Sequence, residues 1–428
     1  MNRSLRPYQC EYVKDSCEEL IHKKRDRISL IAPTGAGKTR IFYSISRRLL
    51  KNKQKIENNK SRKVNICILS PRLSINRQTV SEDNRNMLSI KNKYIKINGH
   101  DYNKSIDTYN SEIRGKNVNF IISSTYQSVS KLKSFIESNN IIIDLMIFDE
   151  YHFIDSWYKD DQYSSDIYKY ILKDDKNIMK RVFCSATPYE RQRDNKEIYG
   201  TVIEKVKVGD LIKDNYLCPI KTVFKDYMGE TNLSKMIINE INTKKKNKIV
   251  IFCNTQANCR SLRQDLAKHI KNNIKLYIFI SDNDNESIGN NQNNEITVRE
   301  NYTTRQQKII DCFEKGGEVS IIITCKKISM GYDFPNIDMI VFADPKCEKI
   351  EIAQCIGRGL RTVSEIPDKL CHVLLPINED ELEKSKYKTV ISYLQYIRDE
   401  CDYEIICGGD FTGSSSVNQK KLQGKDYG

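Results

Sequence analysis

Two glycines, a lysine and a threonine near the start of the chain have the spacing of a phosphate-binding loop. They lie in the segment Ala32-Pro-Thr-Gly-Ala-Gly-Lys-Thr39. In such a loop, backbone amides and the N-terminus of the next helix bind phosphate, the lysine reaches the β- and γ-phosphates, and the threonine ligates magnesium. The strict consensus has glycine where this chain has Ala32, so the match is one residue short. The segment predicts a nucleotide site formed by Thr34, Gly35, Ala36, Gly37, Lys38 and Thr39.

The chain around this loop alternates short apolar runs with polar, amphipathic stretches. The apolar run at residues 28–31 precedes the loop, and a predicted helix at residues 40–50 follows it. Further strands are predicted at residues 64–71, 94–98, 118–125, 145–150 and 181–188, and then at residues 248–254, 275–280, 319–325, 339–344 and 371–376. Apolar strands that alternate with helices indicate an α/β fold whose mostly parallel sheets are covered on both faces.

Five of the strands predicted in the first half are followed by polar residues. These polar ends are Thr34 to Lys38, Ser70 with Pro71, Thr125, Asp149 with Glu150, and Ser185 to Thr187. Parallel strands bring their carboxyl ends to the same edge of a sheet, and ligands bind at that edge. We therefore expect these residues to form one functional rim.

The alternation of apolar strands and polar stretches is interrupted at residues 208–219, where a short helix and turn are predicted. We place a domain boundary there, with a first domain at residues 1–208 and a second at residues 209–400. The second domain repeats the strand pattern but contains no phosphate-binding loop. Residues 281–301 are rich in Asn, Asp and Glu, which predicts a surface insertion, and residues 401–428 are predicted to form a flexible tail.

Composition narrows the class of protein. The 428 residues contain 70 Lys and Arg against 56 Asp and Glu, which gives a net charge of +14. This charge suits a polyanionic partner. It fits equally well a Lys- and Asn-rich protein encoded by an AT-rich genome. The chain has no apolar run long enough to span a membrane and no apolar signal core, so we expect a soluble intracellular protein of the cytoplasm, nucleus or a viral factory. Its 14 cysteines form no C-x-x-C pair and are expected to be reduced and structural.

Taken in order, these segments resemble the motifs of superfamily 2 helicases, the DExH/D class of nucleic-acid-dependent ATPases. The matching segments are residues 6–9, 32–39, 70–73 with Gln78, 124–127, 149–152, 185–187, 251–254, 329–335 and 354–361. Within this class the chain is most similar to the type III restriction-enzyme helicase subunits and related viral helicases. Tyr151 departs from the family, which usually has a small residue at this position. The sequence therefore does not predict how the side chains beside the magnesium site pack.

The resemblance implies two tandem RecA-like domains with an ATP cleft between them. Asp149 would hold Mg²⁺, Glu150 would orient or deprotonate the attacking water, and Arg358 and Arg361 would reach the γ-phosphate when the domains close. The other residues expected at the nucleotide are Gln9, Gly331, Asp333 and Gln354. Those expected to couple hydrolysis to movement are His152, Ser185 and Thr187. At each of these positions, the alternative to the functional role is an ordinary surface or turn residue.

The expected partner is DNA or RNA, held by its phosphates with little sequence preference. The candidate contacts are Pro71, Arg72, Thr125 and Thr324. The leading hypothesis is an ATP-dependent helicase or translocase. A duplex translocase or remodeller without strand separation, and a non-catalytic binding module on a helicase scaffold, remain open. A restriction role has less support, because no nuclease-like cluster follows residue 361. The Asn, Lys and Ile bias suggests a large DNA virus as the source.

Overall fold

The computed structural model describes residues 4–56, 64–88, 92–98, 102–116, 118–154, 165–173, 176–225, 232–270, 273–280, 302–325, 336–363, 366–377 and 386–400. The predicted surface insertion at residues 281–301, the predicted tail at residues 401–428 and the candidate site residues Gly331 and Asp333 lie outside these ranges. Within them, no helix is both long and apolar enough to cross a membrane.

A parallel sheet of seven strands forms the centre of the first half of the described chain. Its spatial order is β3-β4-β2-β5-β6-β1-β7. The strands are β1 (Arg27–Ile31), β2 (Asn65–Ser70), β3 (Asn92–Ile97), β4 (Asn119–Thr125), β5 (Leu145–Asp149), β6 (Arg181–Ser185) and β7 (Thr201–Glu204). All neighbouring pairs run parallel, so the carboxyl ends share one edge.

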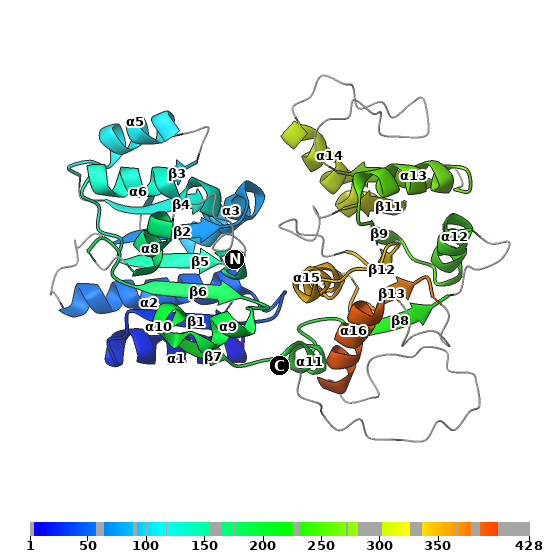
Figure 1. The fold of residues 1–428 in the computed structure, drawn as a ribbon, viewed down its shortest axis with the longest axis horizontal. Coiled ribbons are helices and arrows are strands. Elements are labelled where there is room, and N and C mark those ends of the chain that lie inside the picture. Colours follow the sequence, from blue (N-terminus) through cyan, green and yellow to red (C-terminus); the bar gives the residue numbers. More distant parts are fainter. Residues whose placement is uncertain are drawn as a thin grey trace.

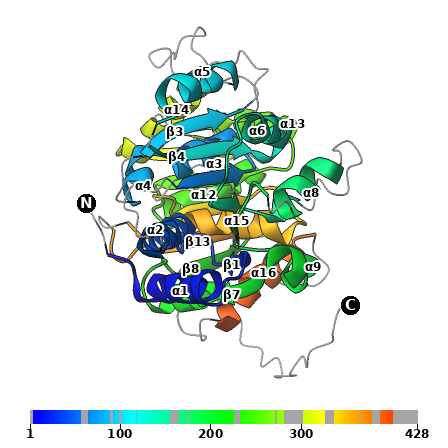
Figure 2. The same ribbon diagram turned by 90° about the vertical axis from the view of Figure 1, so that its left-hand side faces the viewer.

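Helices cover both faces of this sheet, which explains why its inner strands are buried along their length. Side chains alternate along β2, with Ile66 and Ile68 in one core cluster and Cys67 and Leu69 in the other. Figure 2 shows α1 and α2 on one side of the strands and α6 and α8 on the other. The helical elements of this half are α1 (Pro7–Cys17), η1 (Glu18–His22), α2 (Lys38–Ile56), α3 (Leu73–Thr79), α4 (Glu82–Asn86), α5 (Tyr102–Glu112), η2 (Tyr126–Ser128), α6 (Val129–Ser138), α8 (Ser165–Lys173), α9 (Glu190–Asp194) and α10 (Lys196–Tyr199).

A second parallel sheet, with six strands among the described residues, forms the other half. Its order is β10-β11-β9-β12-β13-β8, and all its neighbouring strands run parallel. The strands are β8 (Ile220–Phe224), β9 (Lys248–Phe252), β10 (Ile274–Phe279), β11 (Val319–Thr324), β12 (Met339–Phe342) and β13 (Cys371–Leu375). The helices are α11 (Val208–Lys213), α12 (Leu233–Thr243), α13 (Gln256–Ala267), α14 (Tyr302–Lys315), α15 (Lys349–Gly359) and α16 (Lys388–Glu400).

The two sheets lie side by side, with α11 and α15 on the side of the second sheet that faces the first (Figure 1). The expected α/β class with two tandem parallel sheets is confirmed. Two strands had no predicted counterpart: β7 and β8, which each lie at the edge of a sheet. Only Ile203 of β7 is buried, and β8 carries Lys221 and Thr222, so neither strand presents a continuous apolar run.

The segment between the sheets belongs to a shared core. Leu211 and Ile212 of α11, followed by Leu217 and Cys218, are buried in the same apolar cluster as residues of α1 and α2 and of α15 and α16. The backbone amide of Cys218 donates to the carbonyl of Leu360 at 2.7 Å. The connection is therefore packed against both halves of the described chain.

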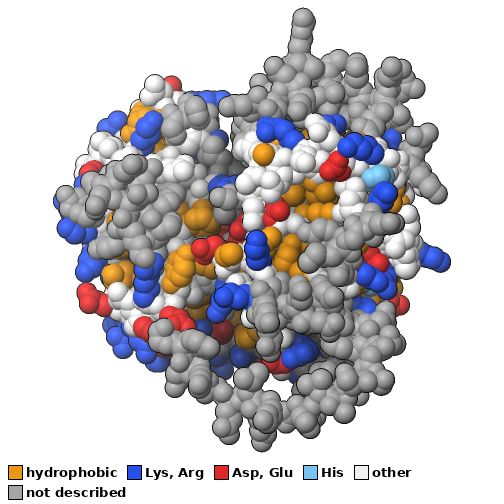
Figure 3. All heavy atoms as spheres, turned by 45° about the vertical axis from the view of Figure 1, so that its right-hand side comes forward, with side chains coloured by type: hydrophobic (Ala, Val, Ile, Leu, Met, Phe, Trp, Pro, Cys, Tyr) orange, Lys and Arg blue, Asp and Glu red, His pale blue; other side chains and the backbone are white. Residues whose placement is uncertain are grey.

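The surface charges are mixed on the face that Figure 3 displays. Lys and Arg side chains there are scattered over both halves and alternate with acidic and apolar ones. Among the side chains coloured in Figure 3, no single basic patch stands out on this face. Charge alone does not locate a polyanion site on it.

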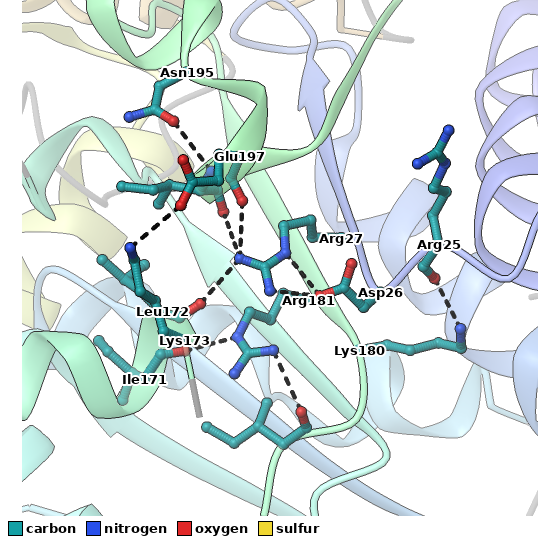
Figure 4. A network of polar contacts seen from close by, with 12 residues as sticks. Arg25, Asp26, Arg27, Ile171, Leu172, Lys173, Lys180, Arg181, Asn195 and Glu197 are labelled. Atoms are coloured by element: carbon teal, nitrogen blue, oxygen red, sulfur yellow. Dashed lines mark hydrogen bonds and ion pairs between the residues drawn. The ribbon is translucent and has the colours of Figure 1, made fainter. Parts of the chain in front are cut away.

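Two arginines hold the amino ends of β1 and β6 in the first sheet (Figure 4). The side chain of Arg181, fully buried at the start of β6, donates from Nε to the carbonyl of Ile171 at 2.9 Å. Arg27, at the start of β1, donates from Nη1 to the carbonyl of Leu172 at 3.3 Å. Both acceptors lie in the last turn of α8, where cations also offset the negative end of the helix dipole. This edge is opposite to the one that carries the predicted rim.

Candidate nucleotide-binding site

The phosphate-binding loop joins β1 to α2, and its shape depends on two glycines. Gly35 and Gly37 have φ values of +89° and +80°, which side-chain-bearing residues rarely adopt. A Cβ at Gly35 would lie 2.7 Å from Leu217, and one at Gly37 would lie 2.6 Å from Gln9 Nε2. Helix α2 begins at Lys38, so its free backbone amides face the loop. The loop conformation that the sequence predicts is present.

Two side chains of α1 hold this loop from behind. The hydroxyl of Tyr8 and the amide of Gln9 both donate to the carbonyl of Ala36, at 2.9 and 2.8 Å. The other end of the Gln9 carboxamide accepts a hydrogen bond from the backbone amide of Arg6 at 3.0 Å. Gln9 is only 1% exposed. Its side chain therefore braces the loop and is buried beneath it.

A cavity of about 470 Å³ opens in front of the loop and is lined from both halves of the chain. The first half contributes Thr34, Gly35, Gly37, Lys38, Thr39, Asp149 and Glu150, and the second contributes Arg358, Arg361 and Thr362. The volume lies in the range of small-molecule sites. Gln9 and Gln354, both expected at the nucleotide, are not among the lining residues.

Asp149 and Glu150 stand at the tip of β5, beside Lys38. Lys38 Nζ lies 3.3 Å from Glu150 Oε1, and the φ of +52° at Glu150 turns the chain sharply at the end of the strand. The hydroxyl of Tyr126 donates to the carbonyl of Asp149 at 2.9 Å, and the hydroxyl of Thr79 lies 3.5 Å from Asp149 Oδ2. Neither Tyr126 nor Thr79 was a candidate in the sequence, although Tyr126 lies within the segment at residues 124–127.

The two carboxyl groups have opposite pKa shifts. Burial, together with the adjacent charge of Glu150, raises the pKa of Asp149 to about 7. Burial would also raise the pKa of Glu150, but the positive charge of Lys38, together with that of His152 when it is protonated, outweighs burial and lowers that pKa. The two adjacent carboxyl groups thus differ: Lys38 keeps Glu150 ionised, whereas its effect on Asp149 is smaller than the combined effect of burial and the charge of Glu150.

Tyr151 directs its side chain into the core, away from the cavity. It is fully buried, and its ring packs 5.6 Å from Phe183 and 5.2 Å from Tyr199 between ring centroids. Gln192 donates to its backbone carbonyl at 3.2 Å. The large side chain at this position therefore fills space behind the strand tips and leaves the cavity open.

His152, Ser185 and Thr187 form a chain of contacts along the rim. His152 Nδ1 lies 2.8 Å from Ser185 Oγ and 3.5 Å from Glu150 Oε2. The backbone amide of Thr187 donates to Ser185 Oγ at 3.1 Å. The structure thus places the three predicted coupling residues together, next to Glu150. Their predicted role in coupling stays a prediction.

Arg358 and Arg361 reach the cavity from the C-terminal end of α15. A Cβ at Gly357 would lie 2.6 Å from Thr34 Cβ, so this glycine allows α15 to pack directly on the loop. Burial lowers the pKa of both guanidinium groups, that of Arg361 to about 10, which leaves it charged at neutral pH. Gln354, one turn earlier, is 7% exposed, and its side-chain oxygen accepts no hydrogen bond within the described part of the chain.

The end of α15 is held by a residue that no sequence motif indicated. Lys369 is 3% exposed, and its Nζ donates to the carbonyls of Gly359 and Arg361 at 2.8 and 2.6 Å. Leu217 forms an antiparallel backbone bridge with Arg361 from the other side. The position of the arginines is therefore fixed by the connection between the halves and by a buried lysine.

The four candidate nucleic-acid contacts differ in placement. Pro71 and Arg72 follow β2, whose last residue pairs with Thr125 at the end of β4, so these three lie at the same edge. The Thr125 hydroxyl donates to Ser128 Oγ at 3.2 Å. Thr324 is fully buried, and its hydroxyl donates to the carbonyl of Phe279 at 2.8 Å. The structure therefore does not support a contact through the Thr324 side chain, because that hydroxyl already bonds within the second sheet.

Two family models match the chain. The model for the type III restriction enzyme res subunit matches residues 2–190, and that for the helicase conserved C-terminal domain matches residues 232–363. Together they cover most of the chain. The first contains the first sheet except for β7, and the second contains β9 to β12 of the second sheet but not β8 or β13.

Two curated relatives are similar at low identity. IRC3 of Saccharomyces cerevisiae, named as an ATP-dependent helicase, is 24% identical over 83% of this chain and 49% of its own length. A859L of African swine fever virus, named as a helicase, is 23% identical over 92% of this chain and 44% of its own length. The chain thus spans about half the length of these relatives.

Solved structures share the fold. The type ISP restriction-modification enzyme LlaBIII bound to DNA superimposes with a TM-score of 0.70 at 16% identity, covering 94% of this chain and 30% of that one. Dbp5 of S. cerevisiae, bound to RNA and ADP BeF3, superimposes with a TM-score of 0.57 at 17% identity, covering 94% of both chains. At these identities the likeness establishes the fold.

Proposed function

Because the chain belongs to the superfamily 2 helicases, with a first domain of the type III restriction-enzyme res subunit family, we propose that it hydrolyses ATP and uses the energy to move on or unwind nucleic acid. The observation that carries the proposal is the composition of one cavity. Lys38 and Glu150 from the first sheet line it together with Arg358 and Arg361 from the second. A site divided in this way is complete only while the two halves are together.

Each residue of the cavity has a separate proposed role in phosphoryl transfer. Lys38 and the amides at the start of α2 bind the phosphates, and Glu150, kept ionised by Lys38, accepts the proton of the attacking water or orients it. Arg358 and Arg361 supply positive charge to the transferred phosphoryl group from the second half. Such an arginine contributes on the order of 10³–10⁵ to the rate. Hydrolysis therefore depends on domain closure.

The donor set at the base of the cavity fits Mg²⁺. Asp149 and Thr39 both line the cavity and offer a carboxylate and a hydroxyl oxygen, the hard ligands this ion prefers. The raised pKa of Asp149 reflects its burial and the negative charge of Glu150, which Lys38 only partly offsets. Asp149 and Thr39 would hold Mg²⁺ there, and the ion would supply positive charge that offsets the charge of the phosphates.

The nucleic acid is proposed to bind by its backbone at the edge where β2 and β4 end. Arg72, which is partly exposed, is the proposed contacting side chain, and the buried Pro71 and Thr125 would position that edge. Solved relatives of the same fold carry DNA in one case and RNA in another, which supports a nucleic-acid partner without choosing between them. Contacts of this kind carry little sequence information. Movement would follow from alternate closing and opening of the two halves.

The experiment is to measure ATP turnover with and without single-stranded DNA, single-stranded RNA and duplex DNA. We expect at least one nucleic acid to stimulate turnover, and we expect Lys38→Ala to abolish it. Lys268→Ala, on the exposed surface just after α13, is the matched control and should leave turnover unchanged. No stimulation by any nucleic acid, or full turnover in Lys38→Ala, contradicts the proposal. Unwinding of tailed duplexes, measured beside triplex displacement, then separates a helicase from a duplex translocase.

A further inference from the structure

The tip of β5 has a strained backbone that its surroundings must hold. Glu150 has a φ of +52°, in the left-handed region that residues with a side chain rarely occupy. Such a conformation persists only where neighbouring contacts outweigh its cost. Asp149 and Glu150, on either side of the start of this turn, both line the cavity. The contacts that hold the tip therefore determine where the two carboxyl groups lie.

Tyr126 holds the backbone of the tip from two strands away. It begins η2, directly after β4, and β2 lies between β4 and β5 in the sheet. Its side chain is 1% exposed, and its hydroxyl donates to the carbonyl of Asp149 at 2.9 Å. Burial raises the pKa of that hydroxyl well above its usual value of 10, so it remains a hydrogen-bond donor. The bond fixes the last carbonyl of β5 immediately before the turn at Glu150.

Thr79 contacts the side chain of the same aspartate. It is the last residue of α3, it is 3% exposed, and it lines the cavity. Its hydroxyl lies 3.5 Å from Asp149 Oδ2, and its carbonyl accepts a hydrogen bond from the hydroxyl of Tyr43 on α2 at 3.1 Å. Asn76, one turn earlier in α3, donates to the carbonyl of Ser124 at 2.9 Å. Thr79 is therefore fixed between α2 and the end of β4, with its hydroxyl beside one carboxylate oxygen.

The two contacts act on different parts of Asp149. The bond from Tyr126 fixes the backbone of the aspartate, and the contact with Thr79 restricts the rotation of its carboxylate. Neither hydroxyl has a role in the phosphoryl transfer described above. Residues that orient a metal ligand in this way change metal affinity or activity by about 10- to 100-fold when they are removed.

We propose that Tyr126 and Thr79 are positioning residues for Asp149, the residue proposed to hold Mg²⁺. The inference rests on the proposed function, because the ion accompanies the nucleotide of that function. Tyr126 fixes the turn that presents the carboxyl group, and Thr79 fixes the orientation of that group. Tyr126 follows β4 and α3 follows β2, the two strands whose ends form the edge proposed for nucleic acid. The ion site and that edge therefore share two supporting elements.

The test is the affinity of the full chain for the β,γ-imido analogue of ATP, measured at equilibrium in Mg²⁺ and again in EDTA. The ratio of the two affinities reports what the ion contributes to binding. Thr79→Val keeps the shape of the side chain without its hydroxyl, and Tyr126→Phe keeps the ring without its hydroxyl. We expect each variant to weaken binding in Mg²⁺ by about 10- to 100-fold and to leave binding in EDTA unchanged.

Controls separate positioning from a general structural role. Thr79→Ser keeps a hydroxyl at the same place and should bind normally in Mg²⁺. Tyr94→Phe removes a hydroxyl that lies 2.7 Å from Ser123 Oγ in the same sheet, and should leave both affinities unchanged.

The inference is overturned for either residue whose variant keeps the affinity ratio of the unaltered chain, which includes equal weakening in Mg²⁺ and in EDTA. An unaltered chain that binds equally well in both conditions would contradict the ion site and this inference together. If the unaltered chain binds the analogue in neither condition, the proposed function itself is wrong.

Discussion

Gly357 allows helix α15 to pack directly on the phosphate-binding loop, so Gly357→Ala should separate the arginines from the loop. The added methyl would lie 2.6 Å from Thr34 Cβ and 2.7 Å from its Cγ2. Carbon atoms in contact are roughly 3.5–4.0 Å apart, so α15 must move by about 1 Å. A misplacement of that size in a catalytic group costs about 10²-fold in rate. We expect kcat for ATP hydrolysis to fall by roughly that factor.

The loss should appear in catalysis and not in folding. Alanine is favoured over glycine within a helix by about 1 kcal/mol, which offsets part of the strain of the close contact. The assay is ATP turnover at saturating nucleic acid, with the thermal midpoint and ATP affinity measured on the same sample. Gly317→Ala is the matched control, because a Cβ there meets nothing within 4 Å. Wild-type turnover in Gly357→Ala would show that α15 need not touch the loop during hydrolysis, and would refute the reasoning.

Two further predictions concern stability. Arg181→Ala removes donors to the carbonyls of Ile171 and Ile178, and should lower the free energy of unfolding by roughly 3–5 kcal/mol in urea titrations. Arg398→Ala on α16 is the control and should change that free energy little. Equal unfolding midpoints for the two variants would contradict this prediction. Burial and nearby lysines such as Lys246 lower the pKa of His372 from 6.5 to about 4. As the pH falls below about 6.5, His372 therefore takes up a proton in the unfolded chain, but in the folded chain it does so only near pH 4. The free energy of unfolding should therefore decrease by roughly 2 kcal/mol as the pH falls through this window, after allowance for solvent screening. His372→Gln should remove this part of the pH dependence, and an unchanged pH profile would contradict it.

The phosphate-binding loop and the polar rim could be predicted because their signals are local. Residues 28–31 form a run that is apolar except for Ser29 and leads into a glycine loop, and the strand that ends at Asp149 is likewise mostly apolar. Parallel pairing then brings such ends to one edge, as the register of β1 with β6 and of β5 with β6 confirms. The edge strand β7 lacked this signal, because one face of an edge strand meets solvent and its burial pattern is broken.

Contacts between distant segments could not be predicted in this way. Lys369 holds the end of α15 by bonding to two carbonyls, and Leu217 packs against Gly35, yet neither residue belongs to a periodic pattern. The position of Gln9 beneath the loop likewise depends on how α1 packs against α2. Thr324 was predicted as a nucleic-acid contact from its place near the end of an apolar strand, but it is buried in the second sheet and its hydroxyl donates to the carbonyl of Phe279. Such placements depend on the tertiary fold.

The central claim is that the nucleotide site is completed by the second half of the chain. Arg361→Ala tests it most directly, with ATP turnover at saturating nucleic acid measured beside the equilibrium affinity for the β,γ-imido analogue of ATP. The account predicts a fall in kcat on the order of 10³–10⁵ while that affinity changes by only a few-fold, because the arginine acts on the transferred phosphoryl group. Turnover equal to that of the unaltered chain would contradict it.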